Sequence, residues 1–362
     1  MNNLQWSVVV CVYNDEENIA ACLQSLKNQT LSTDQYEIIV VDDGSSDQSA
    51  EIIKNINGIH YIYQNNQGPS VARNTGIHAS KGEFIAFTDS DCEVSKNWLE
   101  NLICVFSEYA SENIAGVGGM QLGHPDDPDF GKSVDQFLCA IGFVGDYVKT
   151  HRKIKPVSHN ASCNASYRSN ILKNIGGFRH DMFPGEDVDL DKRLIDNGYT
   201  ILFTPNAIVY HHRPKNSTLW KKMLINYGKA SAHNLMIHGP FRVIQVLPII
   251  FLILPFILLG LLFKFSAVWI FSIFALCFIA GIYLLKSRQN LSFMRTVQFV
   301  FQTVIWFSFG YYQKLIHEVG RANTRFARLS FFLSYVRISI FLGLAVSALG
   351  SFTRSTPFFS SA

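Results

Sequence analysis

The stretch YEIIVVDDGSSDQSAEIIKNI, residues 36–56, contains two different residue patterns. Residues 38–41 are apolar on both faces, as in a strand buried in a parallel sheet. The run ends at the acidic and small residues 42–45, which are typical of turns, and helical spacing follows. The stretch therefore predicts a buried strand, an acidic turn and a helix.

The same alternation extends to both sides of this stretch. Strand patterns cover residues 7–13, 59–65 and 82–91, and helical patterns cover residues 15–30 and 68–80. Alternating strands and helices predict an open, mostly parallel sheet with right-handed crossovers. We therefore expect an α/β fold of the Rossmann-like type for this half of the chain.

Two acidic pairs follow strands of the predicted sheet. Asp42 and Asp43 end the second strand, and Asp89 and Asp91 end the fourth. Ligands of open α/β sheets bind at the carboxyl ends of the strands, so the four carboxylates should converge on one edge. Their mutual repulsion calls for a cation, and Mg²⁺ or Mn²⁺ suits carboxylate and phosphate oxygens. The segment DDGSSD alone would favour a simple turn and helix cap, but the second pair favours a binding site.

Composition excludes several classes of protein. The net charge is only +3, and no basic stripe with interleaved aromatic residues suggests nucleic-acid binding. The seven cysteines show no CxxC pairing, which indicates a reducing compartment and argues against a zinc knuckle. No signal peptide is visible before the first strand, so we expect the α/β half to stay in the cytosol.

A series of motifs resembles the family 2 glycosyltransferases, which have the GT-A fold. The resemblance covers about residues 6–215 and rests on the ordered segments SVVVCVYNDEENI, IIVVDDGSSD, GPSVARNTGI, FIAFTDSD, NASYRSNILKNIGGF, FPGEDVDLDKRL and GYTILFTPNAIVYHH. The resemblance implies transfer of a sugar from a nucleotide-activated donor, with inversion at the anomeric carbon.

The resemblance also assigns the residues of the donor side. It implies that the nucleoside is held by Tyr13, Glu16, Asp42 and Asp43. Arg73 would bring positive charge close to the diphosphate, with a structural or surface arginine as the alternative. Asp89 would lie nearer the ribose and metal, and Asp91 would ligate the metal that clamps the diphosphate. His211 would be a further metal or phosphate ligand, with strand-end packing as the alternative.

The acceptor side is assigned to the segment GEDVDLDKRLIDNG, which predicts a helix after Gly185. Glu186 and Asp187 match the ED motif of the family, so Asp187 is the expected general base. A solvated acidic first turn favoured by the helix dipole is the alternative to a functional role for Asp189 and Asp191, and we expect it for Asp191. The QxxRW motif of processive members is missing from residues 217–231, which favours addition of one sugar or few.

The C-terminal part of the chain reads as a membrane region. We expect a catalytic domain over residues 1–235 and a membrane region over residues 236–362. Residues 241–263 and 266–285 have the length and apolarity of membrane spans and predict a helical hairpin. Residues 297–313 would span or lie in the interface, and residues 330–350 would span, giving three or four segments in all.

The membrane region also predicts the side on which the catalytic domain lies and the kind of sugar acceptor. Basic residues between 286 and 295 place that loop, and the catalytic domain, in the cytoplasm of a multi-pass cell-membrane protein. The acceptor would then be lipid-linked or otherwise membrane-associated, with Tyr227, Lys229 and His233 near the headgroups. Simple anchoring is the alternative.

Three functions compete at this stage. The first is an inverting, metal-dependent glycosyltransferase in glycan or polysaccharide assembly, using a UDP-sugar by family resemblance, with GDP left open. The second is a catalytically inactive scaffold protein in a glycan-assembly complex, against which the intact Asp89, Asp91 and Asp187 speak. A sugar-phosphate nucleotidyltransferase is disfavoured, since its Gly-rich basic phosphate loop is missing.

Overall fold

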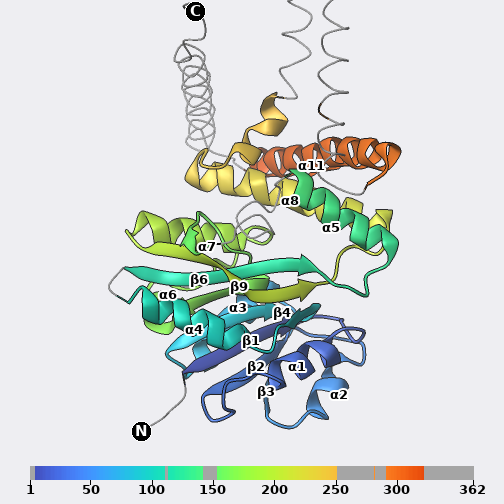
Figure 1. The fold of residues 1–362 in the computed structure, drawn as a ribbon. Coiled ribbons are helices and arrows are strands. Elements are labelled where there is room, and N and C mark those ends of the chain that lie inside the picture. Colours follow the sequence, from blue (N-terminus) through green and yellow to red (C-terminus); the bar gives the residue numbers. More distant parts are fainter. Residues whose placement is uncertain (1–4, 111–112, 142–152, 251–280, 282–290, 322–362) are drawn as a thin grey trace, which may run out of the picture. The chain divides into compact units, whose positions relative to one another are not determined.

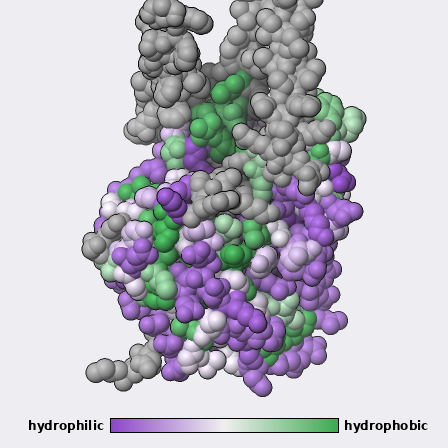
Figure 2. All heavy atoms as spheres, viewed as in Figure 1, coloured by the Kyte–Doolittle hydropathy of each residue, from purple (hydrophilic) through white to green (hydrophobic). Residues whose placement is uncertain are grey.

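The computed structural model describes residues 5–110, 113–141, 153–250, 281 and 291–321 (Figure 1). The chain divides into two units, the first comprising Met1–Met223 with Ala280–Phe299 and the second Leu224–Ile279 with Val300–Ala362. The boundary expected at residue 235 stays a prediction. On the face drawn in Figure 2, the α/β unit shows mainly hydrophilic residues.

The first unit is built on a nine-stranded sheet within the described residues. Its strands are β1 (Trp6–Val12), β2 (Tyr36–Asp42), β3 (Ile59–Tyr63), β4 (Phe84–Asp89), β5 (Cys92–Val94), β6 (Ile114–Gly123), β7 (Lys155–Pro156), β8 (Ala165–Arg168) and β9 (Thr200–His211). Its helices are α1 (Ile19–Lys27), α2 (Ser49–Lys54), α3 (Pro69–Ala79), α4 (Trp98–Glu108), α5 (Asp129–Ile141), α6 (Ser169–Asn174) and α7 (Glu186–Asp196), with the 3₁₀ helix η1 (Ser162–Asn164).

The strand order is β3-β2-β1-β4-β8-β6-β9-β5, with β7 paired to β9. The first four strands are parallel, which confirms the Rossmann-like alternation read from residues 7–91. Strand β8 is antiparallel to both β4 and β6, and β5 and β7 are antiparallel to β9. The α/β fold is therefore confirmed, with a mixed sheet that is parallel in its first half.

Helices cover both faces of the sheet because successive strand residues point to opposite sides. Val8 and Val10 of β1 lie in one core cluster with apolar residues of α1, α2 and α4. Val9 lies in a second cluster with residues of α3, α6 and α7. The residues of both clusters are buried, and the central strands contribute apolar side chains to both. This confirms the burial on both faces that residues 38–41 predict.

The parallel register brings the acidic pairs to one edge of the sheet. Asp42 is aligned with Val12 of β1, and Asp89 is aligned with Cys11 on the other side of the same strand. Strand β1 thus separates the two motifs by the width of one strand. The predicted convergence of the carboxylates at the carboxyl edge is confirmed for these two residues.

Three further helices follow the sheet: α8 (Ser217–His238), the 3₁₀ helix η2 (Val243–Gln245) and α11 (Phe293–Arg321). Within the second unit, the backbones of α8 and α11 approach each other closely at Gly228. Any larger residue there would clash, since its Cβ would lie 2.0 Å from the carbonyl oxygen of Phe307. Among the described residues, no helix combines the length and the apolarity needed to cross a membrane.

The predicted membrane segments fall mostly on other residues. Of 241–263 and 266–285, only residues 241–250 and 281 are described, and 330–350 lies outside the described residues. Residues 297–313 lie within the single long helix α11. The number of membrane segments stays a prediction.

Candidate active site

Asp91 meets His211 at the carboxyl edge of the sheet. Strand β5 follows Asp91 directly and pairs with β9, with Cys92 opposite His211. This register brings Nε2 of His211 to 3.3 Å from Oδ2 of Asp91. Burial opposes ionisation of both groups, but their opposite charges hold the pKa of Asp91 below, and that of His211 well above, its ordinary value.

The donor atoms around this pair fit a divalent cation. A carboxylate and an imidazole are ligands that Mn²⁺ accepts and Mg²⁺ tolerates in part. The thiols of Cys92 and Cys163 lie with His211 in one group of ligand atoms within 4.8 Å of one another, and Glu93, His124 and His212 form a second such group. The sequence predicted Asp91 and His211 here but assigned no role to either thiol. Cys92 directly follows Asp91 in the chain, whereas nothing in the spacing relates Cys163 to the sheet edge.

Arg73 joins three motifs that lie far apart in the sequence. It lies on α3, and its Nη2 donates to Oδ1 of Asp89 at 2.9 Å. Its Nη1 donates to Oε1 of Glu186, the first residue of α7, at 2.6 Å. The guanidinium is only 7% exposed, which excludes the surface alternative. Arg73 thus ties the DxD motif to the ED motif, and direct contact with a diphosphate stays a prediction.

Glu186 is held in place from two sides. Its Oε2 accepts from the backbone N–H of Gly185 at 2.9 Å, and its Oε1 accepts from Arg73. Gly185 has a φ of 107°, a conformation that favours glycine at the start of this helix. Burial raises the pKa of Glu186 even though the charge of Arg73 opposes the shift. The contacts assign Glu186 a positioning role next to the predicted base.

Asp187, the predicted general base, is the more open member of the ED motif. Its side chain is 22% exposed, and its Oδ2 lies 3.7 Å from Nε2 of His159. Its Oδ1 accepts from the N–H of Val188 at 2.8 Å. One carboxylate oxygen is therefore fixed by the start of α7, and the other faces a histidine that the sequence reading did not single out.

The expectation of a solvated position for Asp191 is wrong, and Asp189 is not solvated either. Both side chains are fully buried. Asp189 accepts from Nε of Arg193 at 2.8 Å, and Asp191 accepts from Nδ1 of His159 at 2.9 Å. These donors compensate the burial of charge, which would otherwise be costly. The i, i+4 spacing of Asp189 and Arg193 was a signal for one of the two pairs, whereas His159 is too distant in sequence to be found.

Asp42 and Asp43 are bound by the loops around them. Asp42 is 0% exposed and Asp43 is 4% exposed. Asp42 accepts from Ser45 N at 2.8 Å and from the hydroxyl of Tyr61 at 2.7 Å. Asp43 accepts from Gln64 Nε2 at 2.7 Å, Gln67 N at 2.9 Å and Gly68 N at 2.8 Å. The pair therefore shapes the two loops next to the sheet edge, and its contact with a nucleoside stays a prediction.

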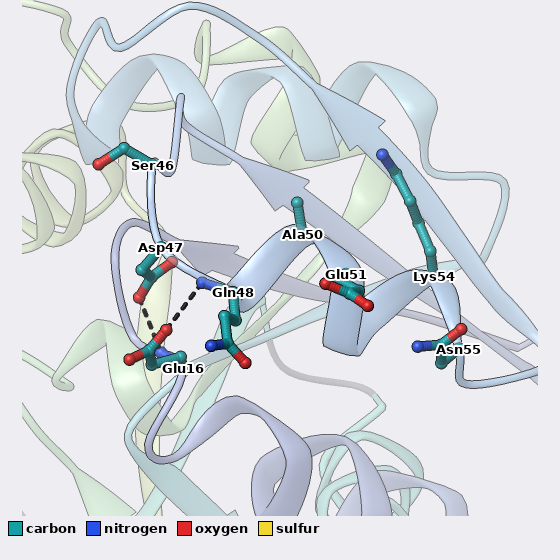
Figure 3. A pocket seen from close by; sticks show the side chains of 8 residues that line it. All are labelled: Glu16, Ser46, Asp47, Gln48, Ala50, Glu51, Lys54 and Asn55. Atoms are coloured by element: carbon teal, nitrogen blue, oxygen red, sulfur yellow. Dashed lines mark hydrogen bonds between the residues drawn. The ribbon is translucent and has the colours of Figure 1, made fainter.

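Tyr13 and Glu16 lie on the loop after β1. Tyr13 is 54% exposed. Glu16 donates its N–H to Oδ2 of Asp47 at 3.0 Å, and its Oε2 accepts from Gln48 N at 2.8 Å. Figure 3 shows these two hydrogen bonds at one end of a surface pocket. The pocket is lined by Glu16, Ser46, Asp47, Gln48, Ala50, Glu51, Lys54 and Asn55. Glu16 thus faces the start of α2.

A neighbour of these residues was missed. The carboxyl of Asp15 hydrogen-bonds the side chain of Ser90, the residue between Asp89 and Asp91, and burial raises the pKa of Asp15. Its backbone N–H donates to Oγ of Ser49 at 3.0 Å. The loop after β1 is therefore tied both to α2 and to the DxD motif.

The acidic motifs thus lie at the carboxyl edge of the sheet in an α/β protein, the edge at which ligands of such sheets bind. Residues 7–176 match the family model described as "Glycosyl transferase family 2". Residues 7–176 therefore form a family 2 glycosyltransferase domain, and the chain is a glycosyltransferase.

Similar proteins include glycosyltransferase AglE of Haloferax volcanii, 29% identical over 229 residues, which are 62% of this chain and 72% of that protein. A second is a dolichyl N-acetyl-α-D-glucosaminyl phosphate 3-β-D-2,3-diacetamido-2,3-dideoxy-β-D-glucuronosyltransferase of Methanococcus voltae, 26% identical over 86% of this chain and 97% of that protein. For several other curated glycosyltransferases the chain covers less than half of their length, between 14% and 46%. The crystal structure of S. aureus TarS is similar with a TM-score of 0.47 at 18% identity, over 68% of this chain and 45% of that one, a likeness too low to carry an argument.

Proposed function

We propose that this chain transfers a sugar, with inversion, from a nucleoside-diphosphate sugar to the hydroxyl of a membrane-associated, lipid-linked acceptor. The observation that carries the proposal is the contact of Arg73 with both Asp89 and Glu186. This contact puts the DxD and ED motifs into one network, next to the pair of Asp91 and His211. One site then has both a cation-binding edge and a partly exposed carboxylate at Asp187.

The chemistry follows from these positions. A Mg²⁺ or Mn²⁺ ion held by Asp91 and His211 would neutralise the charge that develops on the departing diphosphate. Asp187 accepts the proton of the acceptor hydroxyl while the acceptor oxygen attacks the anomeric carbon from the side opposite the diphosphate. Arg73 keeps Asp89 and Glu186 in place during this step and offsets their charges. UDP is the favoured nucleotide by family membership alone.

A membrane-associated acceptor is supported by two observations. The relative from Methanococcus voltae, matched over 97% of its length, is named for a dolichyl phosphate-linked substrate. Within the second unit, Phe301, Ile305 and Phe309 of α11 are 52%, 53% and 51% exposed and recur every four residues on one helix face. Such a face suits the boundary between headgroups and acyl chains.

Location is part of the proposal. The catalytic domain lies on the cytoplasmic side of the cell membrane, and the apolar segments 241–263 and 266–285 anchor it. Fractionation with alkaline carbonate tests the anchoring. The protein should stay in the pellet, and release into the supernatant would contradict a membrane-embedded chain.

Nucleotide release by detergent-purified protein tests the reaction. We expect one donor from a panel of UDP- and GDP-sugars to be turned over with Mn²⁺ or Mg²⁺ in the presence of a lipid extract. EDTA and Asp91→Ala should abolish release, and Asp187→Asn should reduce it by about 100-fold or more. If every donor is inert, and nucleotide binding is unaffected by EDTA and by both substitutions, the proposed transferase function is wrong. The chain would then be a catalytically inactive scaffold protein.

A further inference from the structure

Asp191 is a buried carboxylate to which the proposed reaction gives no task. Its side chain is fully buried on α7. Oδ2 accepts from Nδ1 of His159 at 2.9 Å and from N of Asn160 at 2.7 Å, and Oδ1 accepts from the hydroxyl of Tyr167 at 2.8 Å. Burial of a carboxylate costs several kcal/mol before such contacts are counted, and an apolar residue would fill the same space without that cost. The arrangement therefore calls for an explanation other than packing.

His159 lies between this carboxylate and the candidate base. Asp187 and Asp191 are four residues apart on α7, so they share one face of the helix and a single ring can reach both. Nδ1 of His159 is bonded to Asp191, and Nε2 lies 3.7 Å from Oδ2 of Asp187. The side chain of His159 is 3% exposed. With Nδ1 as the donor to Asp191, Nε2 is the ring nitrogen that faces Asp187.

We propose that His159, oriented by Asp191, is a positioning residue that takes over the proton from Asp187. This inference rests on the proposed function, in which Asp187 is the base. The acceptor O–H bond breaks and its proton moves to Oδ2 of Asp187, while the acceptor oxygen forms the new bond to the anomeric carbon. The bond from that carbon to the diphosphate breaks, and its electron pair leaves with the nucleotide.

The second proton transfer restores the base. The proton passes from Oδ2 of Asp187 to Nε2 of His159, and the resulting imidazolium is stabilised by the carboxylate of Asp191 through Nδ1–H. The proton returns to solvent after the products leave, so every atom and charge is accounted for. The separation of 3.7 Å closes to a hydrogen bond once substrates fill the site, as is usual for catalytic contacts seen without ligands.

A structural role for the same contacts predicts different kinetics. If His159 and Asp191 only tie the chain before η1 to α7, their loss lowers activity by the same factor whether or not Asp187 is intact. If His159 acts through Asp187, its loss has no further effect once Asp187 is gone, because residues that act as a unit are strongly non-additive. A double-mutant cycle distinguishes the two.

The experiment uses the full chain in detergent, with the nucleotide-sugar that gives metal-dependent release and the same lipid extract. We expect His159→Gln and Asp191→Asn each to lower kcat by about 10- to 100-fold, with the KM for the donor changed less than about twofold. His159→Gln should change the residual rate of Asp187→Asn by less than about twofold. His60→Gln on the exposed face of β3 and Asp196→Asn at the exposed end of α7 are matched controls, and thermal melting checks that each variant is folded.

Three outcomes overturn the inference, and they are distinguishable. Equal losses from His159→Gln in both backgrounds, or a raised donor KM with an unchanged kcat, show that the contacts are structural. Full activity of His159→Gln shows that the ring has no part in the reaction, while the proposed function stands. Full activity of Asp187→Asn refutes the base itself and so removes the proposed mechanism together with this inference.

Discussion

Two acidic pairs lie at the same edge of the sheet, one strand apart, and they differ in burial and in the groups that contact them. Asp42 and Asp43 are buried, and their oxygens accept from backbone and side-chain donors of the adjacent loops. The side chains of Asp89 and Asp91 are 32% and 37% exposed, and their partners are the cationic side chains of Arg73 and His211. The first pair is compensated by dipoles and the second by charges.

The difference shows what a carboxylate at a strand end can do. Hydrogen bonds from the loops leave Asp42 and Asp43 little freedom, so they order the chain around a ligand. Asp91 keeps exposed surface and a charged neighbour, so a metal ion can join it without dismantling the fold. Stability should therefore depend mainly on the first pair and on Arg73, and turnover mainly on the second.

Arg73→Met should have the largest effect on this contrast. It leaves Glu186 buried without its cation, and removing one member of a buried ion pair typically costs about 3–5 kcal/mol. Denaturant unfolding measures the loss. Lys215→Met, which breaks an exposed pair with Glu17, is the control and should change little. An unchanged midpoint for Arg73→Met would mean that the network adds nothing to the fold.

Asp91→Asn should separate turnover from stability. Nucleotide release is expected to fall by about 100-fold, or about 2.7 kcal/mol of activation free energy, because the metal loses its charged ligand. EDTA treatment of the unmutated chain, which removes the metal altogether, should abolish release. The melting temperature should stay close to that of the unmutated chain, since Asp91 is partly exposed. A rate indifferent to EDTA would refute the metal site.

Asp43→Ala should show the opposite behaviour. It leaves the N–H groups of Gln67 and Gly68 without their acceptor, which should cost about 2 kcal/mol of unfolding free energy. Asp34→Ala, an exposed residue in the turn before β2, serves as the control in the same denaturation experiment. Equal stability of both variants would show that water replaces the carboxylate and that the loops are not held by Asp43.

Tyr61→Phe should have the smallest effect. It removes the hydrogen bond from the Tyr61 hydroxyl to Asp42 and leaves the one from Ser45 N, so a loss of about 1 kcal/mol in unfolding free energy is expected. Turnover under saturating donor should stay within about twofold of normal. Calorimetry gives the first value and nucleotide release the second. A large loss of turnover with intact stability would place Tyr61 in the donor site instead.

Much of the fold was readable in the sequence. The alternation of patterns over residues 7–91 predicted β1 to β4 and their parallel order, because local hydrophobic periodicity and turn chemistry act within a few residues. The antiparallel insertion of β8 was not predicted, since pairing partners that are about 80 residues apart leave no local pattern. The two clusters of the core followed from the same alternation.

The site was readable only in part. Motif order identified Asp89, Asp91, Asp187 and His211 as candidates, and the structure brings Asp91 and His211 together. The prediction of a solvated Asp191 was wrong because burial depends on what packs against a helix face, and the helix pattern alone does not show it. The placement of Arg73 near a diphosphate stays a prediction, and the structure adds that this residue bridges two carboxylates.

By itself, the sequence determined the order of strands and helices over residues 7–91, the position of the acidic motifs at strand ends and the presence of a family 2 glycosyltransferase domain. These properties depend on residue type and short-range spacing. Only the tertiary structure decided which carboxylates are saturated by loop donors, which keep a cation beside them, and that His159 stands between Asp187 and Asp191. Such contacts join residues from distant segments, and their energies depend on burial and donor geometry that exist only once the sheet has formed.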